Sequence, residues 1–153
     1  MKRQEFELTA HCGLYCGDCI RYNGKVVDLA GELWHELQKA QFDKYAAAKT
    51  QSVKELEDYD PCCRVLEVIA NLKCISPCRL GGNGGGASCA IKKCVKSKGM
   101  QGCWQCHQME KCAKFDFLKP FHGDNPRENL KKIHKYGLDG WAKHRGKFYS
   151  WSK

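Results

Sequence analysis

The sequence predicts a small, mainly α protein with little or no β-sheet, in which short helices carry irregular cysteine-rich knuckles. Apolar residues recur at helical spacing in several segments, strand signals are weak throughout, and ten of the 12 cysteines lie in close-spaced groups. The length of 153 residues suits one domain. We expect a single domain over residues 1–153, with a helical part at 24–72, a cysteine-rich loop region at 74–112 and C-terminal helices at 124–145.

The helical part is predicted to contain two amphipathic helices that pack against a core. The first spans roughly residues 24–48, and the second begins at Asp60-Pro61, where aspartate suits the N-cap and proline suits the first turn. The apolar stripe of the first helix is Val26, Ala30, Leu33, Leu37 and Ala40. The buried stripe of the second helix is Val65, Leu66, Ile69 and Leu72.

A C-terminal helix is predicted to start at Asn125, the expected N-cap, with Pro126 in its first turn. Leu130 and Ile133 follow at helical spacing, and Gly137 is suited to end the helix because glycine tolerates a left-handed backbone. Residues 138–143 are expected to add one short helical turn.

The cysteines form the patterns C-x3-C-x2-C at 12–19, C-x3-C at 74–78, C-x4-C at 89–94 and C-x2-C-x5-C at 103–112. Tetrahedral zinc, with Zn–S bonds of about 2.3 Å, needs neighbouring sulfurs within about 4 Å, and a tight turn between two cysteines supplies that spacing. Gly13, Gly17 and Gly102 permit such turns. The predicted metal ligands are Cys12, Cys16, Cys19, Cys74, Cys78, Cys89, Cys94, Cys103, Cys106 and Cys112.

These ligands divide best into two sites. One site takes Cys12, Cys16 and Cys19 together with Cys78 or Cys74. The second site takes Cys94, Cys103, Cys106 and Cys112, with Cys89 in reserve. About two zinc ions are expected in all.

The surplus of cysteines and the C-x3-C-x2-C triplet leave a [4Fe–4S] cluster as the alternative cofactor. Radical enzymes that use S-adenosylmethionine share this triplet, but their α/β barrel needs more strands and length than this chain has.

The remaining candidate residues are expected to have structural roles. Cys62 and Cys63 are adjacent on a predicted helix and point to different faces, so they rarely bind one ion together. We expect one buried and one partly exposed structural thiol, with a redox-responsive thiol as the alternative. The glycine-rich stretch 81–86 lacks the preceding strand and following Lys-Ser/Thr of a phosphate loop, so we expect a flexible connection. Three histidines near the cysteines are expected to be local hydrogen-bonding or surface residues, with metal ligation as the alternative: His11, His107 and His122.

Charge is distributed unevenly along the chain. Residues 1–91 hold 11 Lys and Arg against 12 Asp and Glu, whereas residues 92–153 hold 15 against 5. The segment 143–151 interleaves basic residues with Phe148, Tyr149 and Trp151, which suggests single-stranded nucleic acid as a partner, with a protein partner as the other expectation. The chain shows no membrane span and no apolar leader segment, so we expect a cytoplasmic protein with reduced thiols.

The cysteine-containing segments together resemble a prokaryotic cysteine-rich domain family of unknown function. The resemblance lies in HCGLYCGDC at 11–19, CAIKKC at 89–94 and CWQC at 103–106 with Cys112, and it continues into His122-Gly123-Asp124. Members usually have a CxxC-like pair where this chain has Cys74 and Cys78. The resemblance implies a metal-binding module that takes zinc or an iron–sulfur cluster, and it implies no reaction.

The predicted function is therefore a zinc-stabilised binding module, because sites filled by four cysteines leave no open position for catalysis. An iron–sulfur redox or sensor protein is the alternative. A catalytic metalloenzyme is disfavoured, since no general base pairs convincingly with a three-ligand site, and no catalytic residue is assigned.

Overall fold

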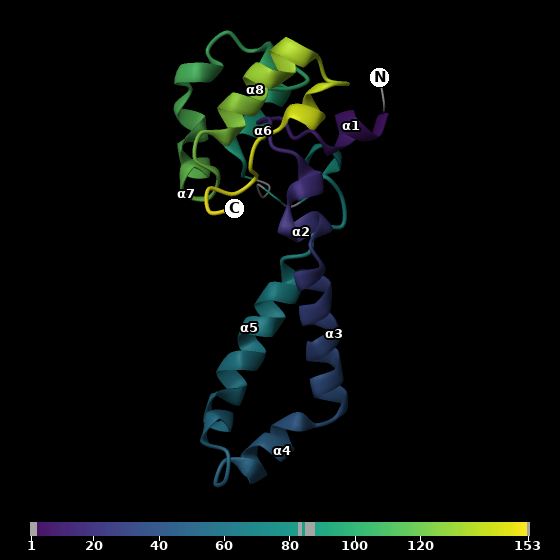
Figure 1. Cartoon of the computed structure of the whole chain (residues 1–153), viewed down its shortest axis with the longest axis vertical. Coiled ribbons are helices and arrows are strands. Elements are labelled where there is room, and N and C mark those ends of the chain that lie inside the picture. The colour runs from purple at the N-terminus through teal and green to yellow at the C-terminus, as the bar shows by residue number, and fades with distance from the viewer. Residues whose placement is uncertain (1–2, 83, 85–87, 153) are drawn as a thin grey trace. The chain divides into compact units, whose positions relative to one another are not determined.

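The structure is a computed structural model that describes residues 3–82, 84 and 88–152. The chain forms two compact units. The hairpin unit is Asn23–Lys73, and the cysteine unit combines Met1–Tyr22 with Cys74–Lys153 (Figure 1). Over the described residues the chain is helical and has no strand beyond an isolated bridge between Thr9 and Tyr15, which confirms the mainly α class.

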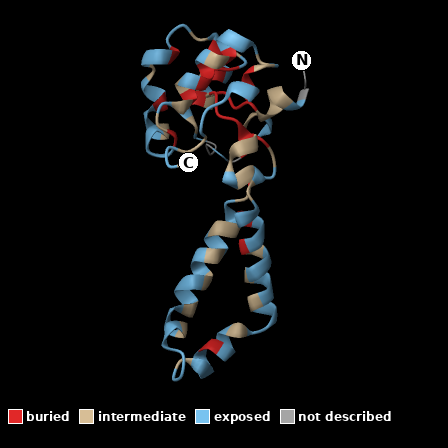
Figure 2. Cartoon of the chain, viewed as in Figure 1, coloured by how far each residue is buried: buried red, intermediate tan, exposed pale blue. Residues whose placement is uncertain are grey.

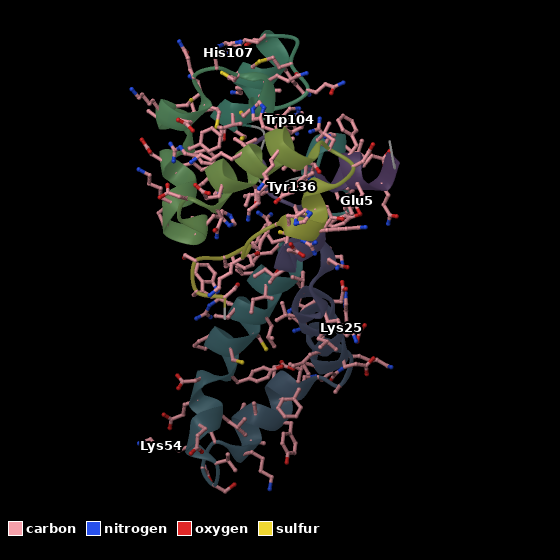
Figure 3. All side chains as sticks on the ribbon, turned by 45° about the horizontal axis from the view of Figure 1, so that its top comes forward. Glu5, Lys25, Lys54, Trp104, His107 and Tyr136 are labelled. Carbon is pink, nitrogen blue, oxygen red and sulfur yellow. The ribbon has the colours of Figure 1, made fainter. Side chains whose placement is uncertain are left out.

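The hairpin unit consists of α3 (Lys25–Lys39), α4 (Phe42–Lys49) and α5 (Tyr59–Asn71), with a 3₁₀ turn at Lys54–Asp58. Helices α3 and α5 pack against each other, and Lys25 and Lys54 lie towards opposite ends of the unit (Figure 3). The prediction of one helix over residues 24–48 is wrong, because the backbone breaks between α3 and α4. Gln41 adopts φ of 50°, a left-handed conformation that ends an α-helix.

The predicted apolar stripes of the hairpin unit are largely exposed. Val26 and Leu33 are each 50% exposed, and no residue of α5 is fully buried (Figure 2). Two helices side by side cover only one narrow strip of each other, so α3 buries just Val27 and Ala30. The expectation of a buried stripe is therefore wrong for the exposed members, which are Val26, Leu33, Ala40, Val65 and Leu72. Ala30 is buried as expected, and Leu37, Leu66 and Ile69 are half-buried.

The cysteine unit contains short helices joined by 3₁₀ turns and loops. The predicted C-terminal helix is confirmed as α8, although its N-cap residue is Asp124 rather than Asn125. Gly137, with φ of 70°, follows its last residue, and a 3₁₀ turn at Trp141–His144 comes next. The α-helices of this unit are α1 (Arg3–Leu8), α2 (Ile20–Asn23), α6 (Ala90–Ser97), α7 (Lys119–His122) and α8 (Asn125–Tyr136).

The core of the cysteine unit forms around Trp141, which is fully buried and donates its indole N–H to Thr9 Oγ1 at 3.1 Å. Gly13 is required where the N-terminal loop meets α8. Its φ is 87°, and a Cβ there would lie 2.8 Å from the Pro126 carbonyl oxygen and 2.9 Å from Leu130 Cγ. The other large buried side chains of this core are Phe115, Leu130, Ile91 and Val95.

Two further expectations concern membrane-spanning helices and the glycine-rich connection. No helix in the described parts of the chain is long and apolar enough to cross a membrane. The flexible connection expected at residues 81–86 falls partly outside the described residues, at 83, 85 and 86.

The Leu130→Ala variant tests this core. We expect it to lower the free energy of unfolding by about 2–5 kcal/mol, because a fully buried leucine leaves a cavity when truncated. Leu80→Ala is the control in the same unit: Leu80 is 55% exposed, so the loss should be about 0.5 kcal/mol. Urea unfolding of both variants measures the difference, and equal losses would contradict the core described above.

Candidate metal centre

Five of the predicted ligands line one cavity in the cysteine unit. The cavity has a volume of about 410 Å³ and is otherwise mainly apolar, with Leu14, Ile91 and Phe148 among its lining residues. We call the five cysteines the cavity group: Cys12, Cys16, Cys19, Cys78 and Cys89. Residues that are up to 77 positions apart in the sequence thus face the same space.

Tight local turns place these thiols. The 3₁₀ turn Cys16–Asp18 closes with a hydrogen bond from the Cys19 N–H to the Cys16 carbonyl at 3.1 Å. Cys78 starts a second 3₁₀ turn directly after Pro77, whose extended backbone precedes it. Cys89 is the N-cap of α6, so its sulfur lies at the positive end of that helix.

Four of the five sulfurs in the cavity group accept a hydrogen bond. The Cys78 N–H donates to Cys16 Sγ at 3.3 Å, and the Lys92 N–H donates to Cys89 Sγ at 3.5 Å. The Tyr149 hydroxyl donates to Cys19 Sγ at 3.8 Å, and Cys12 forms a hydrogen bond with the backbone of Leu14. A neutral thiol is a weak acceptor, so donors aimed at sulfur are better matched to thiolates that bind metal.

The second group of cysteines lies around Cys103, which is buried in the main core beside Trp104. Cys103 and Cys106 are joined by a 3₁₀ turn, in which the Cys106 N–H donates to the Cys103 carbonyl at 3.0 Å. The thiols that raise the pKa of Cys103 after burial are, in order of effect, Cys106, Cys112, Cys94 and Cys89. We call Cys94, Cys103, Cys106 and Cys112 the second group.

Burial keeps the deepest thiols protonated when no metal is present. It raises the pKa of Cys16 to about 11 and that of Cys103 to about 12, and it raises the pKa of Cys12 further still. Neighbouring thiols add to each shift, because two thiolates repel each other. A metal would therefore have to displace protons from these sulfurs as it binds.

The donor chemistry fits a soft metal. Thiolate donors select zinc, copper(I) or iron–sulfur clusters over magnesium and calcium. As placed, no three Cys, His, Asp or Glu side chains of the described residues converge closely enough to hold a metal ion. The cavity group therefore surrounds a space instead of meeting at one point.

The remaining cysteines do not line the cavity, although Cys74 is close enough to Cys16 and Cys78 to raise the pKa of both. Cys74 is buried and its N–H donates to the Arg21 carbonyl at 2.7 Å, but it does not line the cavity, whereas Cys78 does. Cys89, expected in reserve for the second site, lines the cavity and also raises the pKa of Cys103. Cys62 and Cys63 both belong to α5 in the hairpin unit, outside the cysteine unit.

The three candidate histidines have different surroundings. His107 is exposed beside Cys106 (Figure 3). His11 is buried, with Nδ1 3.1 Å from the Gln101 carbonyl oxygen and with Nε2 unpartnered. His122 is buried and lines the cavity, with Nδ1 2.6 Å from the Phe148 carbonyl oxygen. Burial lowers the pKa of both His11 and His122, which favours neutral rings.

Sequence reasoning missed the part that the C-terminal tail plays in this site. Tyr149 donates to Cys19 Sγ and accepts the Ile20 N–H at 3.1 Å, and Arg145 binds both carboxylate oxygens of Asp18, at 2.5 and 2.9 Å. The Arg145 guanidinium also lies 4.7 Å from the centre of the Tyr15 ring. The alternation of basic and aromatic residues was the available signal, but it suggested nucleic acid instead.

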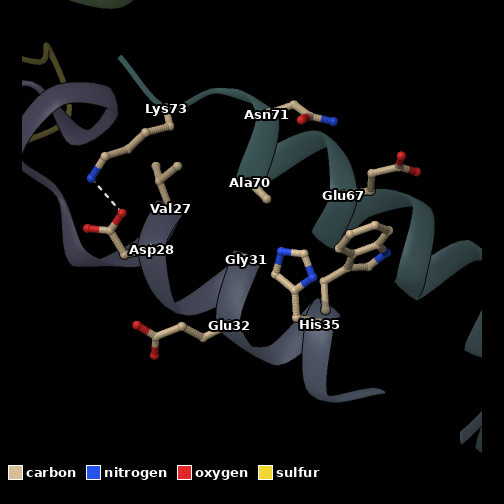
Figure 4. Close-up of a pocket in the computed structure, with 10 residues that line it drawn as sticks. Val27, Asp28, Gly31, Glu32, His35, Glu67, Ala70, Asn71 and Lys73 are labelled. Atoms are coloured by element: carbon tan, nitrogen blue, oxygen red, sulfur yellow. Dashed lines mark hydrogen bonds and ion pairs between the residues drawn. The ribbon is translucent and has the colours of Figure 1, made fainter. Parts of the chain in front are cut away.

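A larger pocket lies in the hairpin unit and carries no cysteine. It has a volume of about 480 Å³ and lies between α3 and α5, with an ion pair between Asp28 and Lys73 (Figure 4). His35, Glu32 and Glu67 also line it, but they do not form a metal-binding group.

Comparison with protein families gives one match, over residues 8–117, to a family described as Protein of unknown function (DUF3795). The chain belongs to this family. The DUF3795 match contains all ten predicted ligands and ends before His122 and Tyr149. No curated protein and no solved structure matches the chain.

Thiol alkylation tests the burial of the candidate ligands in this DUF3795 chain. In reduced, metal-free protein at pH 8, iodoacetamide should modify exposed Cys62 before Cys16 and Cys103, since a raised pKa leaves little thiolate. Modification should accelerate as the pH approaches about 11 for Cys16 and about 12 for Cys103. Mass spectrometry of digests measures each rate; equal rates in protein that retains its helical circular dichroism would contradict the placement.

Tyr149→Phe tests the tail contact. Loss of the hydroxyl removes the hydrogen bonds to Cys19 Sγ and from the Ile20 N–H, so the free energy of unfolding should fall by about 0.5–1.5 kcal/mol for each. Tyr136→Phe is the matched control, because the Tyr136 ring stacks on His144 and its hydroxyl makes no hydrogen bond to another described residue. Urea unfolding should separate the two variants, and an unchanged Tyr149→Phe would argue against the contact.

Proposed function

We propose that the protein binds metal through two cysteine-thiolate centres, one built from the cavity group and one from the second group. The observation that carries the proposal is the hydrogen bonding of the cavity group, in which four of five sulfurs accept from an N–H or O–H donor. Such donors stabilise metal-bound thiolates and tune their electron density.

At the second group we propose a structural zinc ion. Cys103 and Cys106 lie in a 3₁₀ turn with the C-x2-C spacing that zinc knuckles use, and four cysteines are available. Cys103 packs into the main core together with Phe115 and Trp141, so a metal bound there would stabilise the fold of the whole unit. This is the zinc-stabilised module expected from the sequence.

At the cavity group the geometry favours a larger cofactor, and we propose a [4Fe–4S] cluster. One water-sized occupant takes about 30 Å³, whereas the cavity is more than ten times larger at about 410 Å³. Lys92 and Arg79 both act electrostatically on Cys78 and lower its pKa, opposing the effect of burial, and such cations would also offset the negative charge of a cluster. A redox or sensor role follows from this cofactor.

The second candidate function is a purely structural protein with zinc at both centres. The tight turns at Cys16 and Cys78 favour it, because they suit a zinc knuckle as well as a cluster. Both candidates require reduced thiols, which agrees with the proposed location in the cytoplasm.

Nucleic-acid binding by the tail stays a prediction with less support. Tyr149 stacks on His122 and bonds to the cysteine loop, and Phe148 packs in the smaller core, which leaves Trp151 as the exposed member of the three aromatic residues. A partner protein at this tail is equally a prediction.

Metal analysis of protein purified without oxygen tests the proposal. We expect about one zinc with about four iron and four sulfide per chain, whereas two zinc ions without iron would support the structural candidate. Cys16→Ser should lose the iron and keep the zinc, and Cys103→Ser should lose the zinc. Cys62→Ser is the matched control because Cys62 lies on α5, and it should lose neither. Metal-free wild-type protein, or equal loss in all three variants, would refute both candidates.

A further inference from the structure

Aromatic and apolar side chains line the cavity together with the cysteines, and metal binding does not account for them; we call these side chains the aromatic wall. They are Phe117, Leu118, Phe121, His122 and Phe148. Phe117 and Phe121 are 46% and 53% exposed, although large apolar side chains are usually covered in a folded protein. The cavity thus has an apolar rim through which a small molecule could enter.

His122 gives this wall one defined polar atom. A carbonyl oxygen can only accept a hydrogen bond, so the 2.6 Å contact with the Phe148 carbonyl assigns the proton to Nδ1 of the neutral ring. Nε2 is then an acceptor. Because the ring lines the cavity, this wall offers a molecule inside it a hydrogen-bond acceptor and no donor from His122.

The aromatic wall is held in place by contacts of its own. The His122 ring stacks on Tyr149 with centroids 5.4 Å apart and planes at 22°, and it meets the Phe148 ring edge-on at 4.9 Å and 83°. Tyr149 is fixed in turn by the Ile20 N–H, and the Ser150 N–H donates to the Phe121 carbonyl at 2.8 Å. Such preorganisation lowers the entropic cost of binding a ligand.

The size of the cavity agrees with an organic ligand. Small-molecule sites in proteins have volumes of about 300–1,000 Å³, mainly apolar walls and a few placed polar groups, and this cavity of about 410 Å³ shares these properties. A metal centre at the cavity group would occupy part of this volume, so the remaining space suits a molecule about the size of one aromatic ring. Tyr149, whose ring stacks on His122, donates to Cys19 Sγ, so a ligand against His122 would lie beside the cavity group.

We propose that the cavity binds a small, uncharged, mainly apolar molecule about the size of one aromatic ring, with one hydrogen-bond donor directed at His122 Nε2. Its ring packs against Phe121 and Phe148, for which edge-to-face contacts are favourable. The site itself does not depend on a metal. The ligand's position beside a metal centre, which would let that centre sense or act on it, rests on the function proposed above.

Fluorine NMR with 4-fluorophenol and fluorobenzene tests the proposal on the full chain with its metals as isolated. Both probes should bind saturably, and 4-fluorophenol should bind about fivefold more tightly because it alone donates a hydrogen bond. His122→Phe keeps an aromatic ring but removes the acceptor, so the two affinities should become equal. Leu118→Trp should abolish binding of both probes by filling the cavity, and His107→Phe, an exposed control, should change nothing.

Several results would overturn the proposal. These are no saturable binding of either probe, tighter binding of 4-fluorobenzoate than of 4-fluorophenol, or an unchanged fivefold preference in His122→Phe. If Leu118→Trp does not fold, chemical-shift changes confined to Leu14, Phe117, Phe121 and Phe148 in the wild-type protein give the same information. Metal content measured on the same sample separates the two proposals. Probe binding by protein that contains no metal would refute only the proposed metal function. Bound metal without probe binding would refute only the proposed ligand site.

Discussion

The burial of thiols beside one another is the constraint on which the cysteine unit depends. A buried thiol without metal must stay protonated, because burial and neighbouring thiols both raise the pKa of Cys16 and Cys103. A protonated thiol is a weak hydrogen-bond acceptor, yet hydrogen-bond donors are directed at four sulfurs of the cavity group. This mismatch would disappear if the sulfurs were thiolates bound to metal, as proposed above, with local turns, helix α6 and the tail supplying the hydrogen-bond donors.

The C-terminal tail links the end of the cysteine unit to the loop that contains its first cysteines. Arg145 and Tyr149 hold the loop that contains Cys16 and Cys19, through Asp18, Ile20 and Cys19. The same tail places Phe148 and positions His122, so the thiol wall and the aromatic wall of the cavity share one support. Changes in the tail should therefore affect both walls together, although the tail is about 130 residues from the first cysteines.

The sequence predicts local features well, but it predicts poorly which cysteines the fold brings together. The mainly α class and helix α8 follow from periodicity, proline and glycine, all of which act within a few residues. Cys89 and Cys94 appear paired in the sequence, but five helical positions turn a side chain by about 140°, so Cys89 lines the cavity and Cys94 does not, although both act on Cys103. The stripes on α3 and α5 show the same limit: periodicity identifies an apolar face but not what covers it.

The burial of thiols beside one another also explains a small part of the uneven distribution of positive charge along the chain. Lys92, from the basic second part of the chain, and Arg79 lower the pKa of Cys78, and both also act electrostatically on His11. Arg79 lies 4.2 Å from the centre of the Phe6 ring and donates to the Phe6, Thr9 and Gln101 carbonyls, so it is fixed within the fold. Cations held in this way compensate thiolates at short range, whereas a polyanion needs mobile cations on an open surface. Lys92 is thus one cation of the basic second part that is better matched to a cysteine thiolate than to nucleic acid.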